Sequence, residues 1–161
     1  MRAYREILSI PGALKFCAAG LLARSGGAMM GLGIVLMVSS LYGSYGLAGA
    51  LVAANAVSWA LGTAVLSNLV DRYGQRRVMY PATVISVTML AVVVVLAVMQ
   101  VPAWVLFAPV VISGGTGGAP GALVRARWSH VTSDPHLLHA AYSLESTLDE
   151  ITFVVGPVVA T

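Results

Sequence analysis

Charge is scarce in this sequence. Asp, Glu, Lys and Arg make up 9% of the 161 residues, and 58% of the residues are hydrophobic. A soluble domain typically contains roughly 25% charged residues. So few ionic groups could not cover the surface of a water-soluble fold, and the composition therefore predicts an integral membrane protein. Cysteine is almost absent as well. The single Cys17 excludes a disulfide or a cysteine metal cluster within these residues, and we interpret it as a small buried hydrophobic residue.

Long apolar runs dominate the sequence instead. Five of them lie at residues 14–41, 47–70, 78–99, 101–124 and 142–161. Each of the first four exceeds the roughly 20 residues that a helix needs to cross the hydrocarbon core of a bilayer. Because lipid offers no partners to unpaired backbone groups, we expect an all-α, polytopic transmembrane helix bundle. The first run is too long for a cleavable signal peptide and is followed by further spans.

Basic residues lie almost entirely on one side of the predicted spans. The segments 39–46 and 100–102 carry no charge. The other side holds eight of the nine Lys and Arg residues, which are Arg2, Arg5, Lys15, Arg72, Arg76, Arg77, Arg125 and Arg127. The positive-inside rule then predicts a multi-pass protein of the cytoplasmic membrane with a cytoplasmic N-terminus. Since the basic residues form no single stripe, the net charge of +3 does not indicate a nucleic-acid partner.

The two ends of the sequence lead to separate expectations. Before Pro11 we expect a short interfacial helix that turns Tyr4, Ile7 and Leu8 toward lipid. After Glu150 the sequence reads ITFVVGPVVAT, which is too short to cross a bilayer alone. We therefore expect the N-terminal part of a longer protein, with a complete five-span protein as the alternative.

A polar segment separates the second and third runs. Residues 67–77 read SNLVDRYGQRR. This segment resembles the loop between helices two and three of the major facilitator superfamily, which follows the pattern G-x-L-x-D-R-x-G-[RK]-R-[RK]. Ser67 replaces the first glycine with another small residue, and Gln75 replaces a basic residue. The matching positions are Leu69, Asp71, Arg72, Gly74, Arg76 and Arg77.

The resemblance implies that this loop is a latch between the two six-helix halves of a transporter. Asp71 would face a helix N-terminus in a C-terminal half, and Arg72 or Arg76 would bind a nearby acid. Breaking the latch would favour the inward-open state. The residues alone also allow an ordinary surface pair between Asp71 and an arginine, worth under about 1 kcal/mol. In either case, so short a reversal between helices predicts a positive φ at Gly74.

Glycine and proline mark the fourth run. The stretch SGGTGGAPG at 113–121 predicts a soft, bent helix, and no G-K-[ST] follows that would indicate a phosphate loop. The superfamily often carries an arginine in this helix, but Val110 stands near its expected place, so coupling through that arginine is not implied. We interpret Arg125 and Arg127 as the cytoplasmic end of this span.

The fifth run contains a Gly-Pro pair. TFVVGPVVAT resembles the helix-five motif G-x-x-x-G-P-x-x-G-G of proton-coupled antiporters of the same superfamily. Gly156 and Pro157 match, and small residues replace the other glycines at Thr152, Ala160 and Thr161. The resemblance implies a kinked, closely packed helix and favours efflux by antiport.

Small residues recur every four positions in the first two runs. Such faces let helices approach closely in lipid, where burial of apolar side chains gives no driving force. We expect two packing faces, Ala19-Ala23-Gly27-Gly31 and Gly46-Ala50-Ala54-Ser58-Gly62.

Ionisable residues inside predicted spans are candidate functional residues. Arg24 lies deep in the first run and shares a helix face with Gly20, Ala28 and Gly31. Glu145 and Asp149 are four residues apart and so share a face, whereas Glu150 is turned away. We expect Arg24 to face a central cavity and to be balanced by Asp149 or Glu150. The alternative places the acids at the cytoplasmic interface.

Other polar residues carry weaker signals. Asn55 and Trp59 are four residues apart and could line a substrate site with a hydrogen bond and an aromatic wall. His136 and His139 share a helix face but lack a third ligand, so no metal site is predicted. The segment around them is expected to begin a helix capped by Ser133 or Asp134.

These features predict secondary active transport of a small molecule, by proton-coupled efflux with alternating access. The expected partners are a small solute, the lipid bilayer and a C-terminal transporter half. We expect no enzyme activity and no cofactor beyond an ion gradient, which we expect to be a proton gradient. The alternatives are a non-transporting scaffold or assembly subunit and an intramembrane hydrolase. A hydrolase is disfavoured because no histidine lies deep in a span beside a nucleophile such as Ser113.

Overall fold

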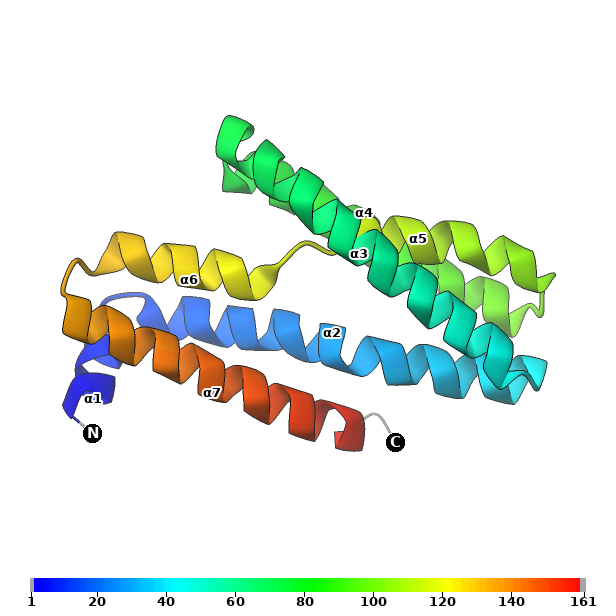
Figure 1. Cartoon of the computed structure of the whole chain (residues 1–161), viewed down its shortest axis with the longest axis horizontal. Coiled ribbons are helices and arrows are strands. Elements are labelled where there is room, and N and C mark those ends of the chain that lie inside the picture. The colour runs from blue at the N-terminus through cyan, green and yellow to red at the C-terminus, as the bar shows by residue number, and fades with distance from the viewer. Residues whose placement is uncertain (1, 160–161) are drawn as a thin grey trace. The chain divides into compact units, whose positions relative to one another are not determined.

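The computed structural model describes the backbone of residues 2–159, and every regular element in that range is helical, which confirms the predicted all-α fold. The elements are α1 (Arg2–Ser9), α2 (Ala13–Tyr42), α3 (Tyr45–Tyr73), α4 (Gln75–Val98), the short 3₁₀ helix η1 (Ala103–Leu106), α5 (Phe107–Thr116), α6 (Pro120–Val131) and α7 (Pro135–Val159) (Figure 1). Ala160 and Thr161, and the side chains of Tyr4 and Pro157, lie outside the described part of the chain.

Four helical stretches are long and apolar enough to cross a membrane. They are Ala13–Tyr42, Tyr45–Tyr73, Gln75–Val98 and Ala103–Val131. The chain is therefore a multi-pass membrane protein. The predicted fifth run lies on α7, which begins at Pro135 and not near Tyr142. With Glu145, Asp149 and Glu150 along its length, α7 is not among the four apolar stretches.

The fourth apolar run is broken, not merely bent. Helix α5 ends at Thr116 and α6 begins at Pro120. Gly118 between them adopts φ +67, and proline has no amide hydrogen to continue the helical bonding. Helix α6 then runs on to Val131, so Arg125 and Arg127 lie inside a helix. The helix therefore continues past these two arginines, and their place at the cytoplasmic end of the membrane-crossing part stays a prediction.

The chain forms two compact units. The first contains the residues up to Leu32 together with those from Ala119 onward, and therefore holds α1, the N-terminal part of α2, α6 and α7. The second contains Gly33–Gly118, and therefore holds the rest of α2 with α3, α4, η1 and α5.

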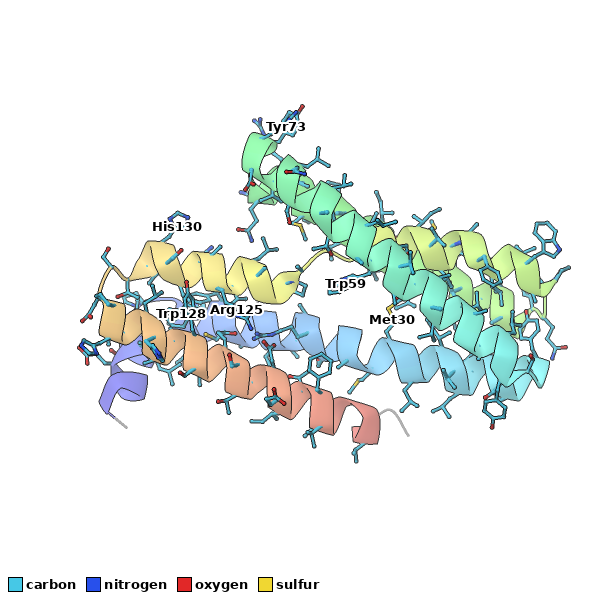
Figure 2. All side chains as sticks on the ribbon, viewed as in Figure 1. Met30, Trp59, Tyr73, Arg125, Trp128 and His130 are labelled. Atoms are coloured by element: carbon cyan, nitrogen blue, oxygen red, sulfur yellow. The ribbon has the colours of Figure 1, made fainter. Side chains whose placement is uncertain are left out.

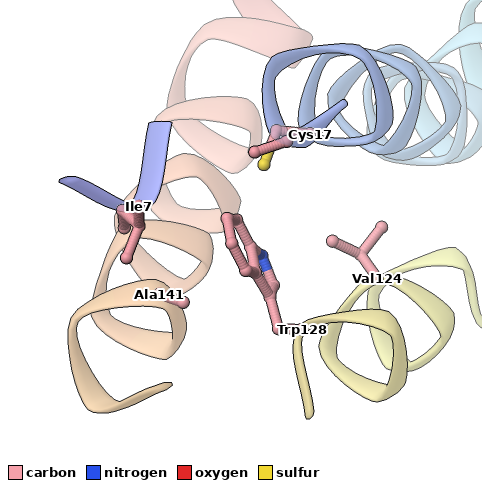
Figure 3. Packing of buried hydrophobic residues seen from close by; sticks show 6 residues of the cluster. Ile7, Cys17, Val124, Trp128 and Ala141 are labelled. Atoms are coloured by element: carbon pink, nitrogen blue, oxygen red, sulfur yellow. The ribbon is translucent and has the colours of Figure 1, made fainter. Parts of the chain in front are cut away.

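Trp128 occupies the centre of the apolar core in the first unit. Its indole ring packs with Ile7, Cys17, Val124 and Ala141 (Figure 3). The expectation that Ile7 faces lipid was wrong, because this side chain is fully buried. Gly12, with φ +87, turns the chain between α1 and α2, and α1 packs against α7. Cys17 is buried, as predicted.

Helix α5 packs against α3 and α4 in the second unit. A Cβ at Gly62 of α3 would clash with the backbone of Gly115 on α5, so only glycine allows this approach. Ser86 of α4 and Ser113 of α5 bind each other reciprocally. The Ser86 hydroxyl donates to the Ser113 carbonyl at 2.8 Å, and the Ser113 hydroxyl donates to the Ser86 carbonyl at 3.0 Å.

The two predicted small-residue faces have different outcomes. On α3, Ser58 and Gly62 lie in the contact with α5, as predicted. On α2, a Cβ at Gly27 or Gly31 would meet no atom within 4 Å, so the predicted face makes no close contact at these positions within the first unit. The neighbouring positions Gly20 and Ala28 make close contacts instead.

Candidate functional site

Four charged residues of the first unit form one hydrogen-bonded network. Arg24 comes from α2, Arg125 from α6, and Glu145 and Asp149 from α7. Helix α7 presents both acids on one face because they are four residues apart. Arg24 lies about 17 Å along α2 from Ala13, at 1.5 Å per residue. The network therefore lies well inside an apolar helix and not at its end.

Glu145 is the buried end of the network. Its side chain is 0% exposed, and its Oε2 lies 2.6 Å from Arg24 Nη2. Its Oε1 accepts from the Trp128 indole N–H at 3.1 Å and from the Cys17 thiol at 3.3 Å. Three donors, from three different residues, therefore surround its two oxygens.

Asp149 bridges the two arginines. Its Oδ1 lies 3.0 Å from Arg24 Nη1, and its Oδ2 lies 2.8 Å from Arg125 Nη2. The exposed fraction rises along the network, from 9% for Arg24 to 23% for Asp149 and 46% for Arg125. Figure 2 labels Arg125 and Trp128, which both extend from α6. Two positive and two negative groups thus balance, with one end buried and the other accessible.

Glycines make room for the network. A Cβ on Gly20 would lie 2.5 Å from Val124 Cγ2, so glycine is needed where α6 approaches α2. The carbonyl of Gly20 also accepts from Arg24 Nε at 3.1 Å. Helix α7 also approaches α2 closely at Ala28. A Cβ built on Gly156 of α7 would lie 3.1 Å from the Cβ of Ala28. Figure 1 shows α6 and α7 beside the N-terminal part of α2.

The predicted partner of Arg24 was partly right. The pair between Arg24 and Asp149 is present, and Glu145 joins it as a second partner. Of the two acids expected as alternatives, Asp149 is therefore the partner, and Glu150 is exposed and lies outside the network. Sequence reasoning missed Arg125 and Trp128 as members. The only signal for them was their spacing of three residues, which places them on one helix face.

Arg127 lies outside the charged network. Its guanidinium carbon lies 5.5 Å from the centre of the Phe16 ring. Phe16 in turn packs edge-on against Trp128, with ring centres 4.7 Å apart. Arg125 and Arg127 are therefore close in sequence but have different partners.

Asn55 and Trp59 make polar contacts within the second unit. The Asn55 amide donates to the Val110 carbonyl at 3.2 Å, and the Trp59 indole donates to the Gly118 carbonyl at 2.8 Å. Gly118 lies in the break after α5, so Trp59 satisfies a carbonyl near the end of that helix. The structure accounts for both donors through packing, and their contact with a substrate stays a prediction.

Most of the segment 67–77 is helical, because α3 extends to Tyr73 and α4 begins at Gln75. Only Gly74 lies between the two helices. Gly74 joins the two helices with φ +85, which confirms the predicted positive φ. Leu69 is half-buried, and the other motif residues, Ser67, Asp71, Arg72, Arg76 and Arg77, are exposed. An open hollow beside the loop is lined by Arg76, Arg77, Tyr80 and Pro81. Asp71 forms no ion pair with any side chain that the structure describes, and the latch stays a prediction.

The Gly-Pro motif lies near the end of α7. Gly156 packs against Ala28, and the Thr152 hydroxyl, which is buried, donates to the Leu148 carbonyl at 2.7 Å. Helix α7 continues through Pro157 to Val159.

The predicted start of the last helix is also present. Asp134 caps α7, because its Oδ1 accepts from the His136 N–H at 2.9 Å. Among the described residues, no three side chains of His, Cys, Asp or Glu come together as a metal site would require. His136 and His139 therefore have no third ligand beside them in this part of the chain.

No protein-family model matches the sequence, and the searches found no similar curated protein and no similar solved structure.

Proposed function

We propose that the chain is part of a secondary active transporter of major facilitator type, which moves a small molecule across the cytoplasmic membrane by alternating access. Transport is coupled to protons, in the direction of export, and involves no covalent chemistry. The observation that carries this proposal is the network that joins Arg24, deep in the apolar helix α2, to Glu145, Asp149 and Arg125 of the neighbouring helices.

Charge is an expensive way to join helices in a membrane. Ionisable groups within membrane helices are costly and usually serve ion or substrate pathways. Removing an ion pair from water costs free energy that its own attraction often does not recover. This chain also joins helices without charge, as at Gly62 and Gly115. The charged network is therefore better explained by function than by packing.

The gradient of exposure suits a group that changes partners. Glu145 is fully buried and holds Arg24, whereas Asp149 and Arg125 reach the accessible end. Alternating access requires interactions that are made in one state and broken in another. In the proposed mechanism, the buried pair keeps Arg24 in place while Asp149 exchanges its outer partner.

The loop between α3 and α4 supports the same proposal. Its aspartate and arginines are exposed at a reversal between two apolar helices. Such groups can bind a second transporter half or anionic lipid at the inner leaflet. This arrangement supports the proposed cytoplasmic N-terminus, which was inferred from the distribution of basic residues.

Solute-dependent proton movement tests the proposal. The product of the full gene would be reconstituted into vesicles containing the pH dye pyranine. A panel of organic cations, organic anions, sugars and amino acids would be added outside. A transporter gives a change of internal pH with at least one solute, and protein-free vesicles give none. A scaffold gives no change with any solute, and this result would overturn the proposal.

A further inference from the structure

The outer oxygen of Asp149 is bound by the most exposed member of the network. Arg125 is 46% exposed, and its Nη2 lies 2.8 Å from Asp149 Oδ2. Ion pairs at this exposure are weak, because water can replace the carboxylate around the guanidinium. Arginine also has a long, flexible side chain, so Arg125 can withdraw while α6 stays in place.

Withdrawal of Arg125 leaves a site with one net negative charge. The remaining groups are Arg24, Glu145 and Asp149, which are one base and two acids. Each of the three guanidinium nitrogens of Arg24 already has a partner. Its Nη1 binds Asp149 Oδ1, its Nη2 binds Glu145 Oε2, and its Nε binds the Gly20 carbonyl. Without Arg125, Asp149 Oδ2 would lose its charged donor. A partly buried carboxylate oxygen without a charged partner is unfavourable.

We propose that Asp149 is a binding site for small organic cations of the guanidinium or amidinium class, and that Arg125 occupies this site as a tethered competitor. The bound ligand replaces the Arg125 guanidinium on Asp149 Oδ2, with planar N–H donors where Nη2 now lies. Arg24, which is itself held by Glu145, binds the inner oxygen of Asp149. Binding of the cation rests on the network alone. That the bound cation is also the transported solute rests on the proposed function.

The tether lowers the affinity of the site for a free cation. A ligand binds only the fraction of molecules in which Arg125 has withdrawn, so its apparent affinity falls by that fraction. Because an exposed pair is weak, the expected effect is moderate. Removing the Arg125 guanidinium should raise the affinity about fivefold.

Calorimetric titration of the full-length protein in detergent micelles tests this proposal, with methylguanidinium chloride as the probe. Arg125→Ala and Arg125→Gln should each bind about fivefold more tightly than the wild type. Asp149→Asn and the double variant Arg125→Ala/Asp149→Asn should lose binding. Arg127→Ala is the matched control, because Arg127 lies on the same helix but contacts Phe16, and it should bind like the wild type. Tetramethylammonium has the charge but no N–H donor, and it should bind more weakly than methylguanidinium.

Three results would overturn the proposal. They are equal affinity in the wild type and both Arg125 variants, retained binding in the double variant, and equal binding of tetramethylammonium. The glutamine variant keeps an amide donor, so it provides the test if the alanine variant fails to fold. Titration in micelles requires no transport. If the Arg125 variants bind methylguanidinium more tightly but the wild type moves no protons in vesicles, the binding site is supported and the proposed function is not. If the wild type moves protons but the Arg125 variants bind no more tightly, the proposed function is supported and the binding site is not.

Discussion

Arg24 of α2 and Glu145 of α7 are 121 residues apart in sequence and form an ion pair, with 2.6 Å between Arg24 Nη2 and Glu145 Oε2. The glutamate is fully buried and the arginine is 9% exposed. Removing one member of such a pair leaves the other as a buried charge, which costs more than the pair contributes. This asymmetry makes the network testable by single substitutions.

Substitution of Glu145 should destabilise the protein strongly. Glu145→Gln keeps the size of the side chain but removes its negative charge beside Arg24. It also replaces one accepting oxygen with an NH₂ group, although three donors surround this position. We expect the free energy of unfolding to fall by about 3 kcal/mol, measured by SDS titration in mixed micelles. Glu150→Gln changes an exposed acid on the same helix and should stay within about 0.5 kcal/mol of the wild type. Equal effects of the two substitutions would show that Glu145 is not buried against Arg24.

Trp128 should contribute to stability through its indole N–H group as well as through its ring. Trp128→Phe keeps an aromatic ring in the core but removes the donor to Glu145 Oε1. A hydrogen bond to a charged group contributes about 2 kcal/mol, so a loss of that size is expected in the same titration. Trp104, which is 76% exposed, is the matched position. A Trp104→Phe variant as unstable as Trp128→Phe would contradict the contact.

The contact between α3 and α5 should tolerate no added methyl group. Gly62→Ala places a Cβ against the backbone of Gly115, and neither backbone can move independently. Overpacking of this kind costs about 1–3 kcal/mol, and the melting temperature in detergent should fall. Gly49→Ala on the same helix meets no atom within 4 Å and should leave the melting temperature unchanged or slightly raised. If both variants melt together, the two helices do not approach at Gly62.

The loop after α3 should be accessible only from the cytoplasm. In a Cys17→Ser background, Gln75→Cys should react with a membrane-impermeant maleimide in inverted vesicles and not in intact cells. Tyr45→Cys, at the opposite end of α3, should show the reverse pattern, since Tyr45 is also exposed. Labelling of Gln75→Cys in intact cells would reverse the proposed orientation.

Local chemistry explains what the sequence predicted well. Apolar length identified α2, α3 and α4. The short connection between α3 and α4 required a positive φ at Gly74, and Asp134 stands before α7 where a capping residue is expected. The scarcity of charge made Arg24 and the acids of α7 conspicuous. These features depend on neighbours in sequence or on the cost of charge in lipid, so they can be seen without a fold.

Features that depend on tertiary contacts could not be predicted in the same way. Periodicity places Gly20 and Ala28 on one face of α2 but cannot show that α6 and α7 cover it, and the neighbouring face looked equally suitable. Ile7 resembled a lipid-facing residue until α1 was seen to pack on α7. The pair between Arg125 and Asp149 could not be predicted from the sequence, because the two residues are 24 positions apart on different helices.

The central claim is that the network of Arg24 and Asp149 couples solute movement to protons, and transport by the variants tests it most directly. Arg24→Ala and Asp149→Asn would be compared with the wild type and Glu150→Gln in pyranine-loaded vesicles, using a solute that moves protons in the wild type. The account predicts that both network variants lose solute-dependent proton movement while Glu150→Gln retains it. Unchanged proton movement in both Arg24→Ala and Asp149→Asn would contradict it.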